Sequence, residues 1–270
     1  MAESTSSRAS SVGADHEIRV EYVEPHVALV EFERAPHNFF DRALIDGLND
    51  TIERLGSGPD VRAVVLCSTG RNFCAGARLQ PSVAADDDHV QYERHLYDAA
   101  SRFIRLPLPI VAAVQGKAVG GGLGLAMACD FRIAASDAVF NTAFARLGIH
   151  QGFGLSVTLP DAVGNVAARR LLYRGLPVSA PDAAMIGLCD EVVSSEDLRD
   201  AAIAEAASIA SAAPLAVRAI RSTLRGDLIA RFDAAVRHER MAQALLRETA
   251  DARDGITAQR ERRAPRFQGR

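Results

Sequence analysis

The chain lacks any long apolar run. No stretch of its 270 residues approaches the roughly 18 consecutive apolar residues that a membrane-spanning helix needs. Residues 1–15 are rich in serine and alanine, and no apolar segment of the kind found in secretory leaders follows the start. We therefore expect a disordered tail over residues 1–15 and no membrane as a partner.

Cysteine is scarce as well. The four cysteines form no CxxC pair, and each lies in an apolar stretch, at Cys67, Cys74, Cys129 and Cys189. This distribution is typical of buried thiols in a reducing compartment. We expect a cytoplasmic protein in which Cys74 is a structural thiol.

No charge of one sign dominates the chain. The 31 basic and 34 acidic residues give a net charge of -3 and are spread along the whole length, so we expect no nucleic-acid partner. The acidic run Asp86, Asp87 and Asp88, followed by His89, does not predict a metal site, because consecutive carboxylates point in different directions.

Apolar residues, in contrast, are plentiful and ordered. At 48% hydrophobic, the chain can bury one large core. Alternation predicts two strands in a hairpin over 18–23 and 27–32, and the spacing of apolar residues after Asp41 predicts a helix that ends at the Gly56-Ser57-Gly58-Pro59 breaker.

Further along the chain, strand signals alternate with helix signals. Two apolar runs, 61–67 and 109–119, predict buried strands of a parallel sheet, and the segment 80–102 between them predicts a pocket cover. Alanine-rich stretches predict helices over 198–212, 215–224 and 229–249. We divide the chain into the tail, an α/β core over 16–197 and a helical region over 198–270.

Two glycine-rich turns carry the chemical signal. The segments 72–79 (Asn-Phe-Cys-Ala-Gly-Ala-Arg-Leu) and 118–127 (Ala-Val-Gly-Gly-Gly-Leu-Gly-Leu-Ala-Met) each follow a predicted buried strand. In the second, three glycines precede a helix, where free amide N–H groups favour a negative charge. Neither GxxxxGK(S/T) nor GxGxxG is present in it, so a nucleotide phosphate is not the best ligand.

The two turns resemble the oxyanion-hole motifs of the crotonase (enoyl-CoA hydratase/isomerase) superfamily, approximately Phe-x-Ala-Gly-Ala-Asp and Gly-Gly-Gly-x-Glu-Leu-Ala. The resemblance continues through 129–134 (Cys-Asp-Phe-Arg-Ile-Ala), 147–149 and 180–188, and ends with 254–267. It implies an α/β fold of the ClpP/crotonase type, a spiral of β-β-α turns with two sheets, and C-terminal helices that form a homotrimer or a hexamer.

The resemblance also implies the ligand, an acyl-CoA, with coenzyme A as part of the substrate and no permanently bound cofactor. The amides of Ala77 and Gly121 are expected to bind the thioester oxygen. Side chains and turns expected to contact the substrate are Pro36, His37, Asn38, Arg78, Leu79, Gly120, Phe144 and Arg262.

The chain departs from the family pattern where a hydratase has two glutamates. Gly124 stands at the first position and Phe144 at the second, and neither can transfer a proton. His150, in a stretch without carboxylates, is the replacement base that we expect, because an imidazole titrates near neutral pH.

Three functions stay open at this point. The first is an acyl-CoA lyase or isomerase that works through a thioester enolate and is not an efficient 2-enoyl-CoA hydratase. The second is a hydrolase of a CoA thioester or a β-diketone that uses His150. The third is a catalytically inert CoA-binding subunit.

Overall fold

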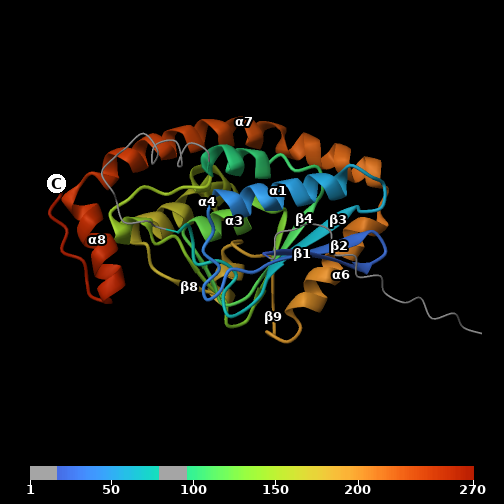
Figure 1. Cartoon of the computed structure of the whole chain (residues 1–270), viewed down its shortest axis with the longest axis horizontal. Helices are drawn as coiled ribbons and strands as arrows, with labels where there is room; N and C mark the ends of the chain where they lie inside the picture. The colour runs from blue at the N-terminus through green and yellow to red at the C-terminus, as the bar shows by residue number, and fades with distance from the viewer. Residues whose placement is uncertain (1–16, 79–95) are drawn as a thin grey trace, which may run out of the picture.

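The computed structural model describes residues 17–78 and 96–270. A six-stranded sheet with the order β1-β2-β3-β4-β6-β9 forms the centre of the molecule, with α1 above it and α6 below it in Figure 1. Its strands are β1 (Ile18–Glu24), β2 (Val27–Phe32), β3 (Ala63–Ser68), β4 (Ile110–Val114), β6 (Phe131–Ala135) and β9 (Glu191–Val193). A second, three-stranded sheet has the order β5-β7-β8 and consists of β5 (Lys117–Val119), β7 (Val139–Asn141) and β8 (Val178–Ser179).

Helices follow most of the strands. They are α1 (Arg42–Gly56), α3 (Gly121–Ala128), the 3-10 helix η1 (Phe144–Leu147), α4 (Leu155–Arg174), α5 (Ala180–Met185), α6 (Leu198–Ser211), α7 (Pro214–Arg247) and α8 (Ala250–Glu261). Within the described parts of the chain no single helix is long and apolar enough to cross a membrane; the strongly bent pair of α6 and α7 meets the length and composition only when both are counted together.

The N-terminal hairpin and the first helix confirm the sequence prediction. β1 and β2 are antiparallel, and β2 then pairs with β3 in parallel. Asp41 caps α1 because its side chain accepts a hydrogen bond from the Leu44 amide at 3.1 Å. The apolar face of α1 is buried, at Leu44, Ile45, Leu48 and Ile52.

The predicted strand over 109–119 is two strands in the structure, one in each sheet. The chain turns between β4 and β5 at Gly116, which has φ +54°, and a Cβ there would lie 1.9 Å from the Arg71 carbonyl oxygen. Only glycine fits so close to another backbone segment. The next two strands are divided in the same way, with β6 in the six-stranded sheet and β7 in the three-stranded sheet. Each of these two turns of the chain therefore adds one strand to each sheet.

The C-terminal helices differ from the prediction in one respect. The two helices expected over 215–224 and 229–249 are a single 34-residue helix, α7, which runs along the top of the molecule in Figure 1. A glycine inside a helix costs only about 1 kcal/mol, and Gly226 has open space around it. A single glycine at this position therefore does not end the helix.

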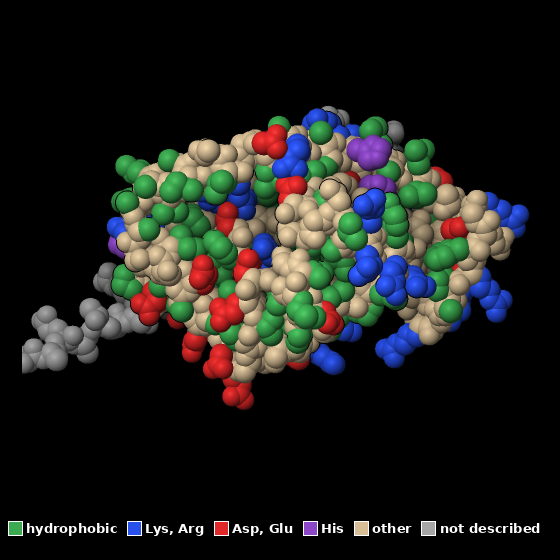
Figure 2. All heavy atoms as spheres, turned by 180° about the vertical axis from the view of Figure 1, so that it is seen from behind, with side chains coloured by type: hydrophobic (Ala, Val, Ile, Leu, Met, Phe, Trp, Pro, Cys, Tyr) green, Lys and Arg blue, Asp and Glu red, His purple; other side chains and the backbone are tan. Residues whose placement is uncertain are grey.

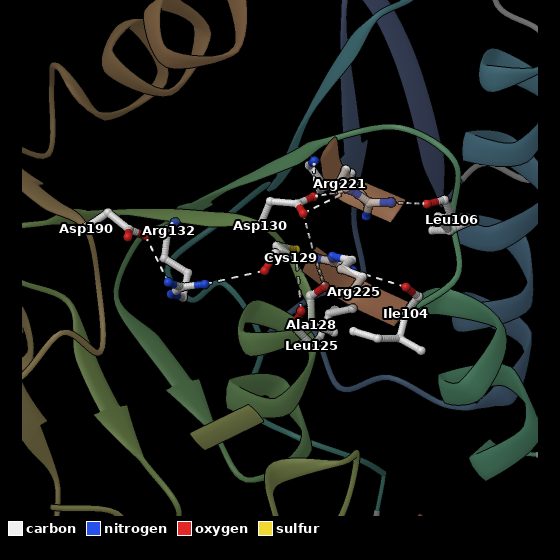
Figure 3. Close-up of polar contacts among 11 residues, drawn as sticks. Ile104, Leu106, Leu125, Ala128, Cys129, Asp130, Arg132, Asp190, Arg221 and Arg225 are labelled. Carbon is white, nitrogen blue, oxygen red and sulfur yellow. Dashed lines mark hydrogen bonds and ion pairs between the residues drawn. The ribbon is translucent and has the colours of Figure 1, made fainter. Parts of the chain in front are cut away.

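A buried ionic cluster joins α7 to the core (Figure 3). Asp130, directly before β6, lies 2.9 Å from Arg221 and 2.8 Å from Arg225, both on α7. Arg225 also donates to the carbonyl oxygens of Ile104 and Ala128. Because Ala128 is the last residue of α3, the cluster fixes α7 against the end of that helix.

We expect Asp130→Ala to lower the free energy of unfolding by about 3–5 kcal/mol, because it leaves two buried guanidinium groups without their carboxylate. Urea denaturation followed by circular dichroism measures the change. Asp161→Ala is the matched control, since Asp161 pairs with Arg231 on the exposed surface, where such a pair contributes about 1 kcal/mol or less. Equal losses in the two variants would contradict this account of the cluster.

Candidate active site

The two glycine-rich turns lie side by side, joined by main-chain hydrogen bonds. The Cys74 amide donates to the Lys117 carbonyl, and the Val119 amide donates to the Cys74 carbonyl, each at 3.0 Å. The approach is close enough that a Cβ on Gly122 would lie 2.2 Å from the Cys74 oxygen. The third of the three predicted glycines, Gly122, therefore allows the close contact between the turns.

The amides of Ala77 and Gly121 come from these separate turns and lie close together. A Cβ built on Gly121 would lie 3.9 Å from the Ala77 nitrogen, and one built on Gly76 would lie 4.0 Å from the Gly121 nitrogen. Phe40 bonds to the residues on either side of Ala77, donating to the Gly76 carbonyl and accepting from the Arg78 amide, so the Ala77 amide points away from Phe40.

Neither amide donates to a carbonyl of the described residues. For Gly121 the reason is that it begins α3, where the first N–H groups have no partner within the helix. Gly120, the residue before α3, has φ +55° and ψ -120°, a conformation for which glycine is suited. Two free donors at the positive end of a helix favour an oxygen atom that carries negative charge.

A cavity of about 770 Å³ opens in front of the two amides, a size that suits a small-molecule ligand. The turns contribute Gly76, Ala77, Gly120 and Gly121, and α8 contributes Arg253, Ile256, Thr257, Gln259 and Arg260. Other lining residues include His37, Phe39, Phe40, Arg78, Leu96, Tyr97, Phe144, Leu147, Ile149, Phe153, Gln243 and Arg247. Among the described residues that line it, none is aspartate or glutamate.

Phenylalanine rings lie at or beside positions 124 and 144, where the sequence resemblance predicts the two glutamates of a hydratase. A Cβ on Gly124 would lie 2.5 Å from the Phe153 Cβ, so the Phe153 side chain leaves no room for a glutamate at position 124. Phe144 lines the cavity and lies 3.7 Å from where a Cβ of Gly120 would be. The wall beside the two amides is therefore apolar. The sequence predicted that Phe144 would contact the substrate, but it did not predict that Phe153 would line the cavity.

The turn expected to contact coenzyme A is held firmly. The Asn38 side chain accepts from the Arg34 amide and donates to the Thr69 and Asn72 carbonyls, each at 2.8 Å. Asn38 is buried and its side chain is used within the protein. Pro36 is exposed after a cis peptide bond, and His37 is exposed and lines the cavity. In this turn, His37 is the side chain placed to meet a ligand.

Of the two arginines expected to contact the substrate, Arg78 lines the cavity and Arg262 does not. Arg78 is exposed at the cavity. Burial acts to raise the pKa of the nearby Asp41 carboxyl, but its hydrogen bond to Arg34 and, to a smaller degree, the charge of Arg78 lower it below its usual value. Arg262 ends α8 with φ +55° and does not line the cavity, whereas Arg253 and Arg260 of the same helix do. Leu79 lies outside the described residues.

His150 does not line the cavity. Its Nδ1 atom lies 2.8 Å from the Gln151 carbonyl oxygen, and its ring packs edge-on against His238 with a centroid distance of 5.7 Å. The described loop presents its neighbours Ile149, Gly152 and Phe153 to the cavity instead. The geometry gives no support to the expected role of His150 as the base.

We accordingly expect His150→Ala to change the rate of any reaction at the two amides by less than about threefold, since a group used in proton transfer contributes 100-fold or more. Steady-state kinetics with an acyl-CoA checks this, with thermal unfolding to verify that the loop is intact. A loss of two or more orders of magnitude in a folded variant would return His150 to the mechanism.

The four thiols are buried and unreactive groups. Burial raises the pKa of Cys74 and of Cys129 to about 12, so both stay protonated at neutral pH. Cys74 therefore has a structural role beside the oxyanion turn. No group of three or more His, Cys, Asp or Glu side chains in the described parts of the chain could hold a metal ion; the run 86–89 lies outside them.

Comparisons with known proteins agree with this geometry. The family profile "Enoyl-CoA hydratase/isomerase" matches residues 23–270. The chain is 33% identical over 251 residues to the (E)-benzylidenesuccinyl-CoA hydratase of Thauera aromatica (92% of this chain, 97% of that one). It is 34% identical over 222 residues to the crotonyl-CoA hydratase of Syntrophomonas wolfei subsp. wolfei (82% and 85%). The crystal structure of an enoyl-CoA hydratase/isomerase from Pseudoalteromonas atlantica superposes with a TM-score of 0.80 at 28% identity, over 93% and 100% of the two chains.

The likeness in three dimensions establishes the class of protein: this is an α/β protein of the crotonase fold, as the two glycine turns predicted. The chain belongs to the enoyl-CoA hydratase/isomerase family, whose members act on acyl-CoA.

Proposed function

We propose that the chain is an acyl-CoA enzyme that stabilises a thioester enolate between the amides of Ala77 and Gly121, and that it is not an efficient 2-enoyl-CoA hydratase. One observation carries both parts. The two free amides face a cavity whose described lining holds no carboxylate.

The thioester oxygen is the group that fits the amides. When a proton leaves the α-carbon of an acyl-CoA, negative charge develops on this oxygen, and fixed N–H donors stabilise it. Removing one such donor costs about 3 kcal/mol in comparable sites. The apolar surroundings of Phe144 and Phe153 strengthen the effect because little water competes for the amides.

The basic end of the molecule suits the phosphates of coenzyme A. Arginine side chains gather at the end formed by α8 and the C-terminal segment (Figure 2). Arg253 and Arg260 of α8 and Arg78 of the first turn line the cavity on this side. Guanidinium groups bind phosphate oxygens in a forked geometry.

Hydration of a 2-enoyl-CoA needs a group that activates water at the β-carbon, usually a carboxylate pair. With phenylalanine rings at these positions, the reactions that fit are those that need mainly the enolate: a proton shift, or a lyase reaction in which a group of the substrate or a water accepts the proton. Lyase or isomerase is thus the reaction class that we assign.

The test uses two thioesters and nuclear magnetic resonance in deuterium oxide. With butyryl-CoA, we expect the protein to accelerate exchange of the α-protons, which reports the enolate directly. With crotonyl-CoA, we expect loss of the enoyl absorbance to be slower than this exchange. Rapid hydration would contradict the proposal, release of free thiol would indicate a hydrolase, and binding without any exchange would indicate an inert CoA-binding subunit.

A further inference from the structure

The cavity wall near the two amides is largely apolar. Phe144, Ile149 and Phe153 line it and are each less than 10% exposed. Tyr97, in the helical residues 96–103, and Gln243, on α7, also line the cavity. Their polar head groups have no role in the two-amide site described above.

The two head groups meet on the cavity face of Gly152. A Cβ built on Gly152 would lie 2.9 Å from the Tyr97 hydroxyl oxygen and 2.9 Å from the Gln243 Nε2 atom. Any side chain on residue 152 would crowd both groups, so glycine lets the phenol and the amide come together here, and both line the cavity. Because they come from separate helices, the fold and not the local sequence brings them to one point.

The Gln243 amide is fixed in one orientation. Its Nε2 donates to the His150 carbonyl oxygen at 2.7 Å, and its Oε1 accepts from Arg247 at 3.2 Å. These two bonds leave one N–H of the amide for another acceptor. Four residues earlier on α7, the Glu239 carboxylate accepts from the amides of Gly154 and Ser156 at 2.8 and 2.9 Å, which holds the loop that carries Gly152.

The Tyr97 side chain is half-buried and lines the cavity, and its hydroxyl has no hydrogen-bond partner among the described residues. Burial raises the pKa of the phenol, and the nearby Glu239 carboxylate raises it further, so the hydroxyl keeps its proton at neutral pH. The phenol is thus a donor without an acceptor among the described residues, and the cavity gives a ligand access to it.

We propose that Tyr97 and Gln243 form a subsite for a neutral acceptor oxygen, a ketone or hydroxyl carried by the acyl group of the substrate beyond the thioester carbonyl. This inference rests on the proposed acyl-CoA function and adds the class of acyl group. Both free donors point to an acceptor, and the buried Glu239 carboxylate beside Tyr97 disfavours an acyl carboxylate through repulsion.

The test compares the affinities of hexanoyl-CoA and of its 3-oxo, 4-oxo and 5-oxo derivatives by isothermal titration calorimetry. We expect at least one oxo-acyl-CoA to bind about tenfold more tightly than hexanoyl-CoA, the gain typical of one well-placed hydrogen bond. Tyr97→Phe removes only the hydroxyl and should bring the ratio of the oxo-acyl-CoA affinity to the hexanoyl-CoA affinity to about one. Tyr173→Phe, at an exposed position on α4, is the matched control and should keep the preference.

Three outcomes overturn the inference: no preference for any oxo derivative in the wild-type protein, a preference that survives Tyr97→Phe, or a preference for an acyl group with a terminal carboxylate, such as adipoyl-CoA, that depends on Tyr97. Gln243→Leu supplies a second, independent variant in which the preference should also fall. If hexanoyl-CoA itself does not bind, the proposed acyl-CoA function fails first, so the two failures are distinguishable.

Discussion

Gly121→Pro is expected to slow the exchange of butyryl-CoA α-protons by 100-fold or more relative to Gly121→Ala. Proline is tolerated at the first position of a helix, which Gly121 occupies in α3, but it has no N–H. The loss of one of two donors to an enolate oxygen costs about 100- to 1,000-fold in rate. The measurement is the exchange rate at saturating butyryl-CoA.

Gly121→Ala is the control because both substitutions add a Cβ at the same place. This atom would lie 2.6 Å from the edge of the Phe40 ring, so both variants must shift that ring, and only proline removes the donor. Similar rates in the two folded variants would show that the Gly121 amide takes no part. Binding of free coenzyme A, measured in parallel, verifies that the rest of the cavity is intact.

Phe144→Glu is expected to raise the rate of crotonyl-CoA hydration at least tenfold. It places a carboxyl group in the apolar wall close to Gly120, at the position where relatives that hydrate are expected to have their second glutamate. Burial raises the pKa of such a carboxyl toward neutrality, which suits proton transfer, and general acid–base catalysis contributes about 100- to 10,000-fold when the geometry is right. The initial rate of enoyl absorbance loss measures the gain.

Phe144→Gln is the matched variant, since glutamine has the shape of glutamate and cannot transfer a proton. Equal rates for the Glu and Gln variants would mean that the missing carboxylate does not limit hydration. A wild-type rate already as high as that of Phe144→Glu would contradict the account of the apolar wall. Gly124→Glu alone should give no gain, because Phe153 occupies the space that this side chain needs.

Much of the fold could be predicted from the sequence because local signals and packing agree. Asp41 caps α1 as its position before an amphipathic stretch indicated, and the hairpin of β1 and β2 follows the alternation of apolar residues. The prediction was wrong where a local signal competes with tertiary contacts. The run 109–119 breaks at Gly116 because Arg71 lies against it, and that neighbour is not visible in the local sequence.

The sequence also indicated that the backbone turns of Ala77 and Gly121 lie close together. Glycine patterns report backbone positions, and the two turns of Ala77 and Gly121 lie together as the patterns required. Side-chain roles were not predictable in the same way. Ile149 lines the cavity, but its neighbour His150 does not. Which of two adjacent residues faces the cavity depends on how the loop packs on α7.

Several residues that line the cavity were missed, and three of them matter for the proposals above. Phe153 carried a usable signal, since a glycine at 124 in place of the family's glutamate leaves space that a large side chain must fill. Tyr97 and Gln243 carried none, because each lies in a helical pattern where a polar residue is unremarkable and their meeting at Gly152 is a property of the tertiary structure.

The chemical shift of the thioester carbonyl carbon in bound, carbonyl-labelled [1-¹³C]butyryl-CoA tests the central claim most directly. Two N–H donors in an apolar cavity polarise the C=O bond, so we predict a downfield shift on binding to the wild-type protein and its loss in Gly121→Pro. A bound thioester whose carbonyl resonates as it does in water would show that the amides of Ala77 and Gly121 do not hold this oxygen, and the account would be wrong.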